Sequence, residues 1–381
     1  MFKHTNKTIF SVYLTYFISM VLFTLTRIAA ANGIFNNVHS QVSSIIYSVI
    51  IQIFIMFLIP LTIFSLINKK EGGFKRTFNS SQFKPIKPKV ILIAIALGLL
   101  AFFINIAVST VFNGFISFFG YNNPFVSGGA EIPIFSGGWE LLINLVLVAL
   151  LPAFCEEFLH RGLLLNEISK IGYKKAIILS ALLFSLIHFN INQISYAFVI
   201  GLILAVVVVV SKNIWPAIII HFINNGISVY ITSAKANGWF GGNFYEIISN
   251  FLQSQSPILT LISSFTFLVL IVFTVIYLLM LLFKETTIAK VNNAINSVLY
   301  SGNNNSPNKP NYADEYKVLN EILLKNSSLN VEYDKAASPI DIILPVNKNI
   351  YKPSVLDNTF LIASIVLGGL ATIFTFVWGI L

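Results

Sequence analysis

Two acids, a histidine and an arginine lie inside one apolar stretch of the chain, L-P-A-F-C-E-E-F-L-H-R-G-L-L-L. An ionisable side chain at the centre of a bilayer costs about 2.5 to 3.5 kcal/mol on insertion scales, so each of these residues needs a partner or a function. Glu157 and Arg161 are four residues apart on one helical face and are predicted to form a structural ion pair. Glu156 projects about 100° away from Glu157 around the helix, which leaves its carboxylate without that partner.

Two later apolar stretches carry further polar side chains at a spacing of four residues. F-S-L-I-H-F places His188 four residues after Phe184, and I-W-P-A-I-I-I-H-F-I-N-N places His221 four residues before Asn225. Residues four apart share a helical face. Ordinary apolar packing does not require histidines in these stretches, so the pattern indicates a functional cluster.

The same side chains are predicted to lie at one depth in the membrane. Glu156 and His188 are each 16 residues from Gly172, which is about 24 Å along a helix from a turn at that glycine. His221 and Asn225 lie about 14 and 20 Å from the turn that precedes their helix. We therefore expect the four groups to converge near mid-bilayer or somewhat beyond it.

Such a cluster supports two hydrolytic mechanisms. In the first, Glu156 is a general base that takes a proton from a water bound by His188, while His221 and Asn225 donate hydrogen bonds to the oxyanion. In the second, His188, His221 and Glu156 bind Zn²⁺, which lowers the pKa of its bound water to about 7. Both mechanisms hydrolyse an amide bond.

Neighbouring residues have plainer interpretations. Cys155 is small and flanked by apolar residues, which favours a packing role. His160 is interpreted as a packing or interfacial residue, although it can approach Glu156 at a spacing of four. Asn224 competes with Asn225 for the same position, and the spacing from His221 favours Asn225.

The composition predicts an all-α, polytopic membrane protein with a small cytoplasmic insertion. Of 381 residues, 56% are hydrophobic and 10% are charged, whereas a soluble domain carries roughly 25% charged residues. The single cysteine excludes disulfide scaffolds and cysteine zinc clusters. A net charge of +9 with only three arginines, and lysines placed between apolar runs, indicates a bilayer rather than nucleic acid. We predict about nine transmembrane helices, over residues 9–30, 44–67, 90–119, 139–165, 176–189, 194–211, 214–233, 258–283 and 360–378.

The three polar stretches fit E-E-x-x-x-R, F-x-x-x-H and H-x-x-x-N, in this order and on successive spans. In this the chain resembles the CPBP family of intramembrane proteases, which includes type II CAAX prenyl endopeptidases and bacteriocin-processing proteins once grouped as Abi. The resemblance covers about residues 139–233. It implies that Glu156 is the catalytic base, that Glu157 and Arg161 buttress its helix, that His188 binds the attacking water, and that His221 and Asn225 line the oxyanion site.

The resemblance also favours the glutamate mechanism without a cofactor over the zinc mechanism.

The predicted spans and the extent of the resemblance divide the chain into five parts. These are amino-terminal membrane helices over 1–138, a protease core over 139–233, an outer loop and helix over 234–283, a polar cytoplasmic insertion over 284–358 and a last transmembrane helix over 359–381. An amphipathic helix is predicted over 314–326. The first apolar run is interpreted as a span rather than a cleaved signal peptide.

The leading hypothesis is an intramembrane endopeptidase that cleaves a membrane-associated or lipidated peptide or precursor. Its partners would be that substrate and the lipid bilayer, with no nucleic acid, and a protein partner could use the insertion. The loop over 68–89 is rich in lysine, so the N-terminus is expected inside. The expected location is a bacterial cytoplasmic membrane. A proton-coupled transporter and a non-enzymatic bacteriocin-immunity protein are the alternatives, since mid-membrane Glu and His also form proton relays.

Overall fold

A computed structural model describes residues 6–36, 38–121, 138–254, 256–288 and 351–380. These residues form helices and turns, without a β-strand in the ranges just given. The first elements are α1 (Lys7–Ala31), α2 (Ser40–Val49), the π-helix η2 (Ile50–Leu58), α3 (Ile59–Ile67), α4 (Gly73–Ser80) and α5 (Pro88–Ser117). One long helix then runs through α6 (Gly138–Asn144), η4 (Leu145–Leu150), α7 (Leu151–Glu157), η5 (Phe158–Leu165), α8 (Asn166–Ile168) and η6 (Ser169–Ile171). The remaining elements are α9 (Tyr173–Leu186), α10 (Ile191–Ser211), α11 (Trp215–Asn237), α12 (Phe244–Gln253), α13 (Pro257–Phe283), η7 (Lys284–Ile288) and α17 (Val355–Trp378).

Eight helices among the described residues are long and apolar enough to cross a membrane. They are α1, the α2–α3 helix, α5, the α6–η6 helix, α10, α11, α13 and α17. The predicted polytopic all-α membrane protein is thereby confirmed.

The predicted fifth span is wrong as a complete crossing, because α9 has only 14 residues. A helix of that length is about 21 Å long, whereas a bilayer core is about 30 Å thick. The helix ends at Leu186, and the chain reverses through Phe189, whose φ of 49° is left-handed. Asn190 then caps α10, with its side chain accepting a hydrogen bond from the backbone N–H of Asn192. His188 therefore lies in the turn between α9 and α10 rather than on a helix.

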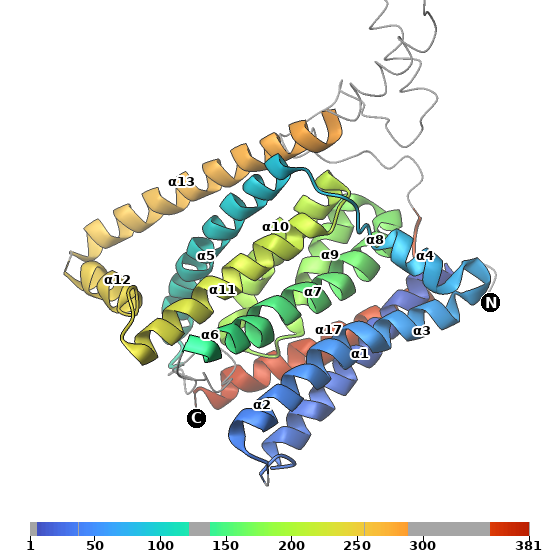
Figure 1. Ribbon diagram of the computed structural model, residues 1–381, viewed down its shortest axis with the longest axis horizontal. Coiled ribbons are helices and arrows are strands. Elements are labelled where there is room, and N and C mark those ends of the chain that lie inside the picture. The colour runs from blue at the N-terminus through green and yellow to red at the C-terminus, as the bar shows by residue number, and fades with distance from the viewer. Residues whose placement is uncertain (1–5, 37, 122–137, 255, 289–350, 381) are drawn as a thin grey trace, which may run out of the picture.

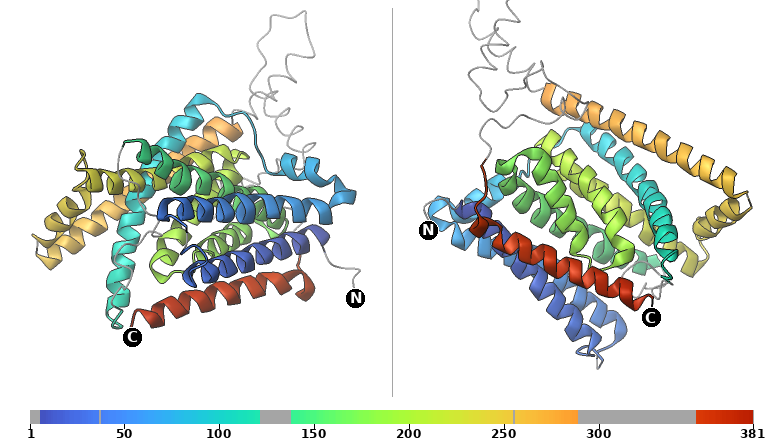
Figure 2. Two further views of the ribbon diagram at one scale, coloured as in Figure 1. Left: turned by 60° about the horizontal axis from the view of Figure 1, so that its bottom comes forward. Right: turned by 180° about the vertical axis from the view of Figure 1, so that it is seen from behind.

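The helices form three groups, which Figure 1 shows side by side. The helices α7, α9, α10 and α11 lie in the middle, with α1, α3 and α17 on one side and α5 and α13 on the other. Figure 2 shows from behind that α17 runs along the outside of this bundle, next to α1. The middle helices carry all three motifs, so the bundle surrounds the candidate site.

The basic stretches 68–89, 166–175 and 211–214 meet at one end of the bundle, which we call the lysine-rich end. Gln82 Nε2 donates to Asn166 Oδ1, and Asn213 Nδ2 donates to the carbonyl oxygen of Lys84. Arg76 Nη2 lies 2.8 Å from the buried carboxylate of Glu167, which also binds Lys170 Nζ at 2.5 Å. The start of α17 is tied to the start of α1 because Asn6 N donates to Asp357 Oδ1 at 3.0 Å. Both helices therefore begin at the lysine-rich end and run parallel.

Two predicted features outside the core have different outcomes. The stretch 234–257, predicted to be an outer loop, instead contains the last turn of α11 and the ten-residue helix α12. Of the polar insertion predicted over 284–358, residues 289–350, which include the helix predicted over 314–326, lie outside the described residues.

Candidate active site

The two glutamates end a short α-helical segment that is flanked on both sides by π-helical turns, η4 and η5. π-helical turns within helices are frequent at functional sites. Pro152, near the start of α7, has no N–H to donate to the carbonyl oxygen of Val148 four residues earlier. That oxygen accepts a hydrogen bond from Asn225 Nδ2 on α11, at 3.4 Å. The contact that the proline leaves open thus joins η4, the turn before the two glutamates, to α11, the helix of the third motif.

Glu157 is fully buried and is held by two cationic or potentially cationic groups. Its Oε1 lies 2.8 Å from Arg161 Nη1 and 3.0 Å from His221 Nδ1. Arg161 is also fully buried, and its Nη2 donates to the carbonyl oxygen of Gly201 on α10 at 3.1 Å. The carboxylate of Glu157 therefore links α7, η5 and α11, and the guanidinium adds α10.

Glu156 has a different environment from its neighbour. Its side chain is 7% exposed, and its Oε1 accepts a hydrogen bond from Gln52 Nε2 on η2 at 3.0 Å. Its Oε2 is buried and has no hydrogen-bond partner among the residues that the structure describes. A buried carboxylate oxygen without a partner is costly, so this atom is suited to hold a water or a substrate group.

Phe184 brings the histidines of the cluster together. Its ring meets those of His160, His188 and His221 edge to face, with centroids 5.0, 5.4 and 5.7 Å away. The guanidinium of Arg161 lies over the same ring, 4.4 Å from its centroid. The aromatic residue of the F-x-x-x-H motif is therefore a packing centre for residues from three helices.

His188 is half-buried in the turn after α9. Its carbonyl oxygen accepts a hydrogen bond from Arg27 Nη1, near the end of α1, at 2.9 Å. Arg27 thereby fixes the turn that carries His188. The imidazole of His188 meets the ring of Phe184, which also meets the ring of His221.

His160 is directed away from the carboxylate of Glu156. Its Nδ1 donates to the backbone carbonyl oxygen of Glu156 at 2.7 Å, and its Nε2 lies 3.1 Å from the hydroxyl of Tyr16. The Tyr16 hydroxyl also lies 2.8 Å from the carbonyl oxygen of Leu183. His160 therefore joins η5 to α1 and α9, and the approach of its ring to the Glu156 carboxylate at a spacing of four does not occur.

His221 and Asn225, which were predicted to donate hydrogen bonds to an oxyanion, each already contact other protein groups. His221 Nδ1 lies 3.0 Å from Glu157 Oε1, so this ring nitrogen is engaged with the carboxylate. Asn225 Oδ1 accepts from Asn224 Nδ2 at 2.9 Å, and Asn225 Nδ2 is the group that reaches Val148. An amide nitrogen carries two protons, so Asn225 keeps one for a further acceptor.

The alternative zinc mechanism requires His188, His221 and Glu156 as ligands. Across the described part of the chain, no three His, Cys, Asp or Glu side chains are grouped so that they could hold a metal ion. The contact with Glu157 engages only Nδ1 of His221, and Arg27 binds the backbone carbonyl oxygen of His188 rather than its ring.

The sequence reasoning missed two residues that touch this cluster. Gln52 is the single amide side chain in the apolar run I-I-Q-I-F-I, and a lone polar residue inside a span is a signal that could have identified it. Gly201 gave no signal. A Cβ on Gly201 would lie 3.1 Å from Ala181 Cα and 3.2 Å from Phe184 Cδ1, so its absence permits the close packing of α10 on α9.

Comparison with known proteins supports the assignment made from the motifs. Residues 138–227 match the family model described as Rce1-like, Type II CAAX prenyl endopeptidase Rce1-like. No curated protein and no solved structure matches the chain. The matched segment holds every motif residue from Glu156 to Asn225, and the family supports an intramembrane endopeptidase activity in general terms. Residues 138–227 are therefore similar to the Rce1-like type II CAAX prenyl endopeptidases.

Proposed function

We propose that this protein is an intramembrane endopeptidase that hydrolyses a peptide bond in a membrane-associated or lipidated peptide, using a water activated by Glu156. The observation that supports this most directly is the buried, unpartnered Oε2 of Glu156 within the described residues. The other oxygen of the same carboxylate is held by Gln52. Glu157 also has a buried oxygen without a partner among the described residues, Oε2. Its Oε1, however, is held by Arg161 and His221, whereas Oε1 of Glu156 is held only by a neutral amide. The two adjacent glutamates thus have separate roles, base and anchor.

The proposed reaction follows from these positions. Glu156 Oε2 takes a proton from a water that His188 orients, and the water oxygen attacks the peptide carbonyl carbon. When the C–N bond breaks, Glu156 returns the proton to the leaving nitrogen. The products are a carboxyl group and an amine, and no redox partner is consumed.

Charge that develops on the carbonyl oxygen needs hydrogen-bond donors. Asn225 provides one through the second proton of Nδ2. His221 is the second donor in this proposal, and it donates through Nε2 because its Nδ1 faces Glu157. Removal of one oxyanion donor of this kind costs about 10²- to 10³-fold in kcat.

The experiment uses the purified full chain in lipid vesicles with a library of prenylated and unmodified peptides. Cleavage is followed by mass spectrometry for wild type, Glu156→Gln and His221→Ala. The control is Glu71→Gln, which removes a partly exposed carboxylate at the lysine-rich end. We expect Glu156→Gln to lose about 10²- to 10⁴-fold of activity and Glu71→Gln to keep it.

Four outcomes would change this proposal. Full cleavage by a folded Glu156→Gln protein removes Glu156 as the base. Loss of activity with a chelator and recovery with Zn²⁺ would replace the metal-free reaction by a zinc-dependent one. If vesicles with wild type cleave no peptide but take up protons, the transporter alternative gains support; with neither activity, the immunity-protein alternative does.

The orientation belongs to the same proposal. The positive-inside rule favours a cytoplasmic lysine-rich end, and hence a cytoplasmic N-terminus in a bacterial inner membrane. The orientation is tested with Lys75→Cys in the Cys155→Ala background, which leaves one cysteine at the lysine-rich end. This cysteine should react with a membrane-impermeant thiol reagent in inverted vesicles, where the cytoplasmic side faces outward, and not in right-side-out vesicles.

A further inference from the structure

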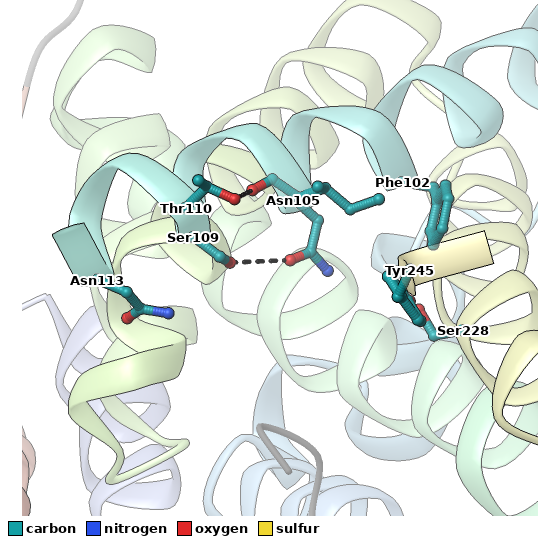
Figure 3. Close-up of a pocket in the computed structure, with 8 residues that line it drawn as sticks. Phe102, Asn105, Ser109, Thr110, Asn113, Ser228 and Tyr245 are labelled. Carbon is teal, nitrogen blue, oxygen red and sulfur yellow. Dashed lines mark hydrogen bonds between the residues drawn. The ribbon is translucent and has the colours of Figure 1, made fainter. Parts of the chain in front are cut away.

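A cavity of about 250 Å³ with a mixed polar and apolar lining lies between α5, α11 and α12, apart from the residues assigned above. Figure 3 shows its lining side chains, which include Phe102, Asn105, Ser109 and Asn113 from α5, Ser228 from α11 and Tyr245 from α12. No part of the proposed reaction uses these residues. A cavity of this size can hold several atoms of a ligand rather than a single water.

The polar side chains on α5 form a stripe in an otherwise apolar helix. Between Lys89 and Ser117, the polar residues are Asn105, Ser109, Thr110 and Asn113. Asn105, Ser109 and Asn113 are spaced by four and share a face, and all four line the cavity. Ser109 Oγ lies 3.2 Å from Asn105 Oδ1. Polar groups inside a span are costly and indicate a partner that is itself polar.

The chemistry of the lining indicates what that partner is. The cavity carries amides and hydroxyls but no charged side chain. Asn113 Oδ1 is buried and has no hydrogen-bond partner within the described ranges. Amides and hydroxyls together provide donors and acceptors, as one N–H and one C=O of each peptide unit require. A neutral peptide backbone fits this lining, whereas an ionic group does not.

A protease substrate has such a backbone. A segment held for hydrolysis inside the membrane is extended, so it has lost its helical hydrogen bonds, and each unsatisfied group costs several kcal/mol in hydrocarbon. A polar cavity beside the reacting bond offsets this cost.

The cavity lies close enough to the proposed site for this purpose. Ser228 Oγ donates to the carbonyl oxygen of Asn224 at 3.3 Å. Ser228 is about 4.5 Å along α11 from Asn225 and about 10 Å from His221. An extended chain advances about 3.3 Å per residue. The cavity is therefore roughly two to three residues from the bond to be cleaved, on the side that faces away from the lysine-rich end.

We propose that this cavity is a subsite that binds the extended backbone of the substrate, two to three residues from the scissile bond and away from the lysine-rich end. The proposal rests on the protease function proposed above. It assigns the substrate class as a peptide that continues past the cleaved bond, not one that ends there.

The test combines binding and cleavage by the full chain in vesicles. Short peptides extend by one residue, and long peptides by four residues, on either side of a known or candidate cleavage position. Each long peptide also carries a photoreactive diazirine. The variants are Asn113→Leu and Ser109→Val, with Ser117→Val as the matched control on the exposed end of the same helix. Melting temperatures verify that all variants fold.

The expected binding result is a crosslink from the long peptide to α5 in wild type and in Ser117→Val. The crosslink should weaken in Asn113→Leu and Ser109→Val. In cleavage, wild type should prefer long peptides, and each cavity variant should lose about three- to tenfold of kcat/KM for long but not short ones.

The two proposals can fail separately. Crosslinking to α5 without any cleavage would retain the subsite and reject the protease. Cleavage with no α5 crosslink, or with the same length preference in all variants, would reject the subsite. If only peptides that end at the cleaved bond are bound and cut, the subsite proposal is also overturned.

Discussion

Gln52 is predicted to be a positioning residue for Glu156, and the prediction can be worked out quantitatively. Its Nε2 lies 3.0 Å from Glu156 Oε1, at a site where both side chains are buried. A hydrogen bond to a charged group contributes about 1.5 to 3 kcal/mol, which corresponds to about 10- to 150-fold in rate if it is lost only in the transition state. Gln52→Leu removes the donor and keeps similar volume. We therefore expect kcat to fall within that range.

The kinetic pattern separates positioning from binding. Gln52 makes no contact assigned to substrate, so KM should stay near its wild-type value while kcat falls. Gln41→Leu, an exposed glutamine at the start of the same membrane helix, is the matched control and should leave both constants unchanged. Rates are measured on single peptides at several concentrations, after the folded fraction has been determined by size exclusion.

A double-mutant cycle decides whether the effect passes through Glu156. In a Glu156→Leu background there is no carboxylate for Gln52 to hold. The loss of stability caused by Gln52→Leu should then shrink by about 1.5 to 3 kcal/mol, the energy of the hydrogen bond to a charged group. If the two substitutions are additive, or if Gln52→Leu raises KM and leaves kcat intact, the reasoning about Glu156 is refuted.

Three further predictions concern the packing around the site. Phe184→Leu removes a ring that lies under the guanidinium of Arg161 and should cost about 2 kcal/mol of stability, seen as a lower melting temperature; an unchanged melting temperature would contradict the ring's role. Gly201→Ala should lower the melting temperature because its Cβ would lie 3.1 to 3.2 Å from α9, whereas Gly369→Ala, with nothing within 4 Å, should not; equal effects would argue against close packing. Glu157→Gln leaves the fully buried Arg161 without its carboxylate and should cost about 3 to 5 kcal/mol, so little folded protein is expected on size exclusion. Normal yield and stability of that variant would show that the ion pair is not structural.

Much of the fold was predictable because hydropathy is local. The run predicted over 258–283 is the helix Pro257–Phe283, and the run over 194–211 ends at the same residue as the helix Ile191–Ser211. The exception is the predicted fifth span, which ends in a turn at Phe189 with a left-handed φ. Apolar residues continue through this turn, so hydropathy did not reveal where the helix stops.

The sequence alone determined the membrane class, the long helices and the three motifs, since these depend on residue types and on spacing along one helix. The spacing of four between Glu157 and Arg161 likewise predicts their contact within a single helix. The tertiary structure decided the partners that come from other helices: Gln52 for Glu156, Glu157 for His221, and Phe184 as the centre of the histidines. These contacts depend on how each helix is rotated and shifted against its neighbours, and that is set by close packing at positions such as Gly201, which hydropathy and motif spacing do not encode.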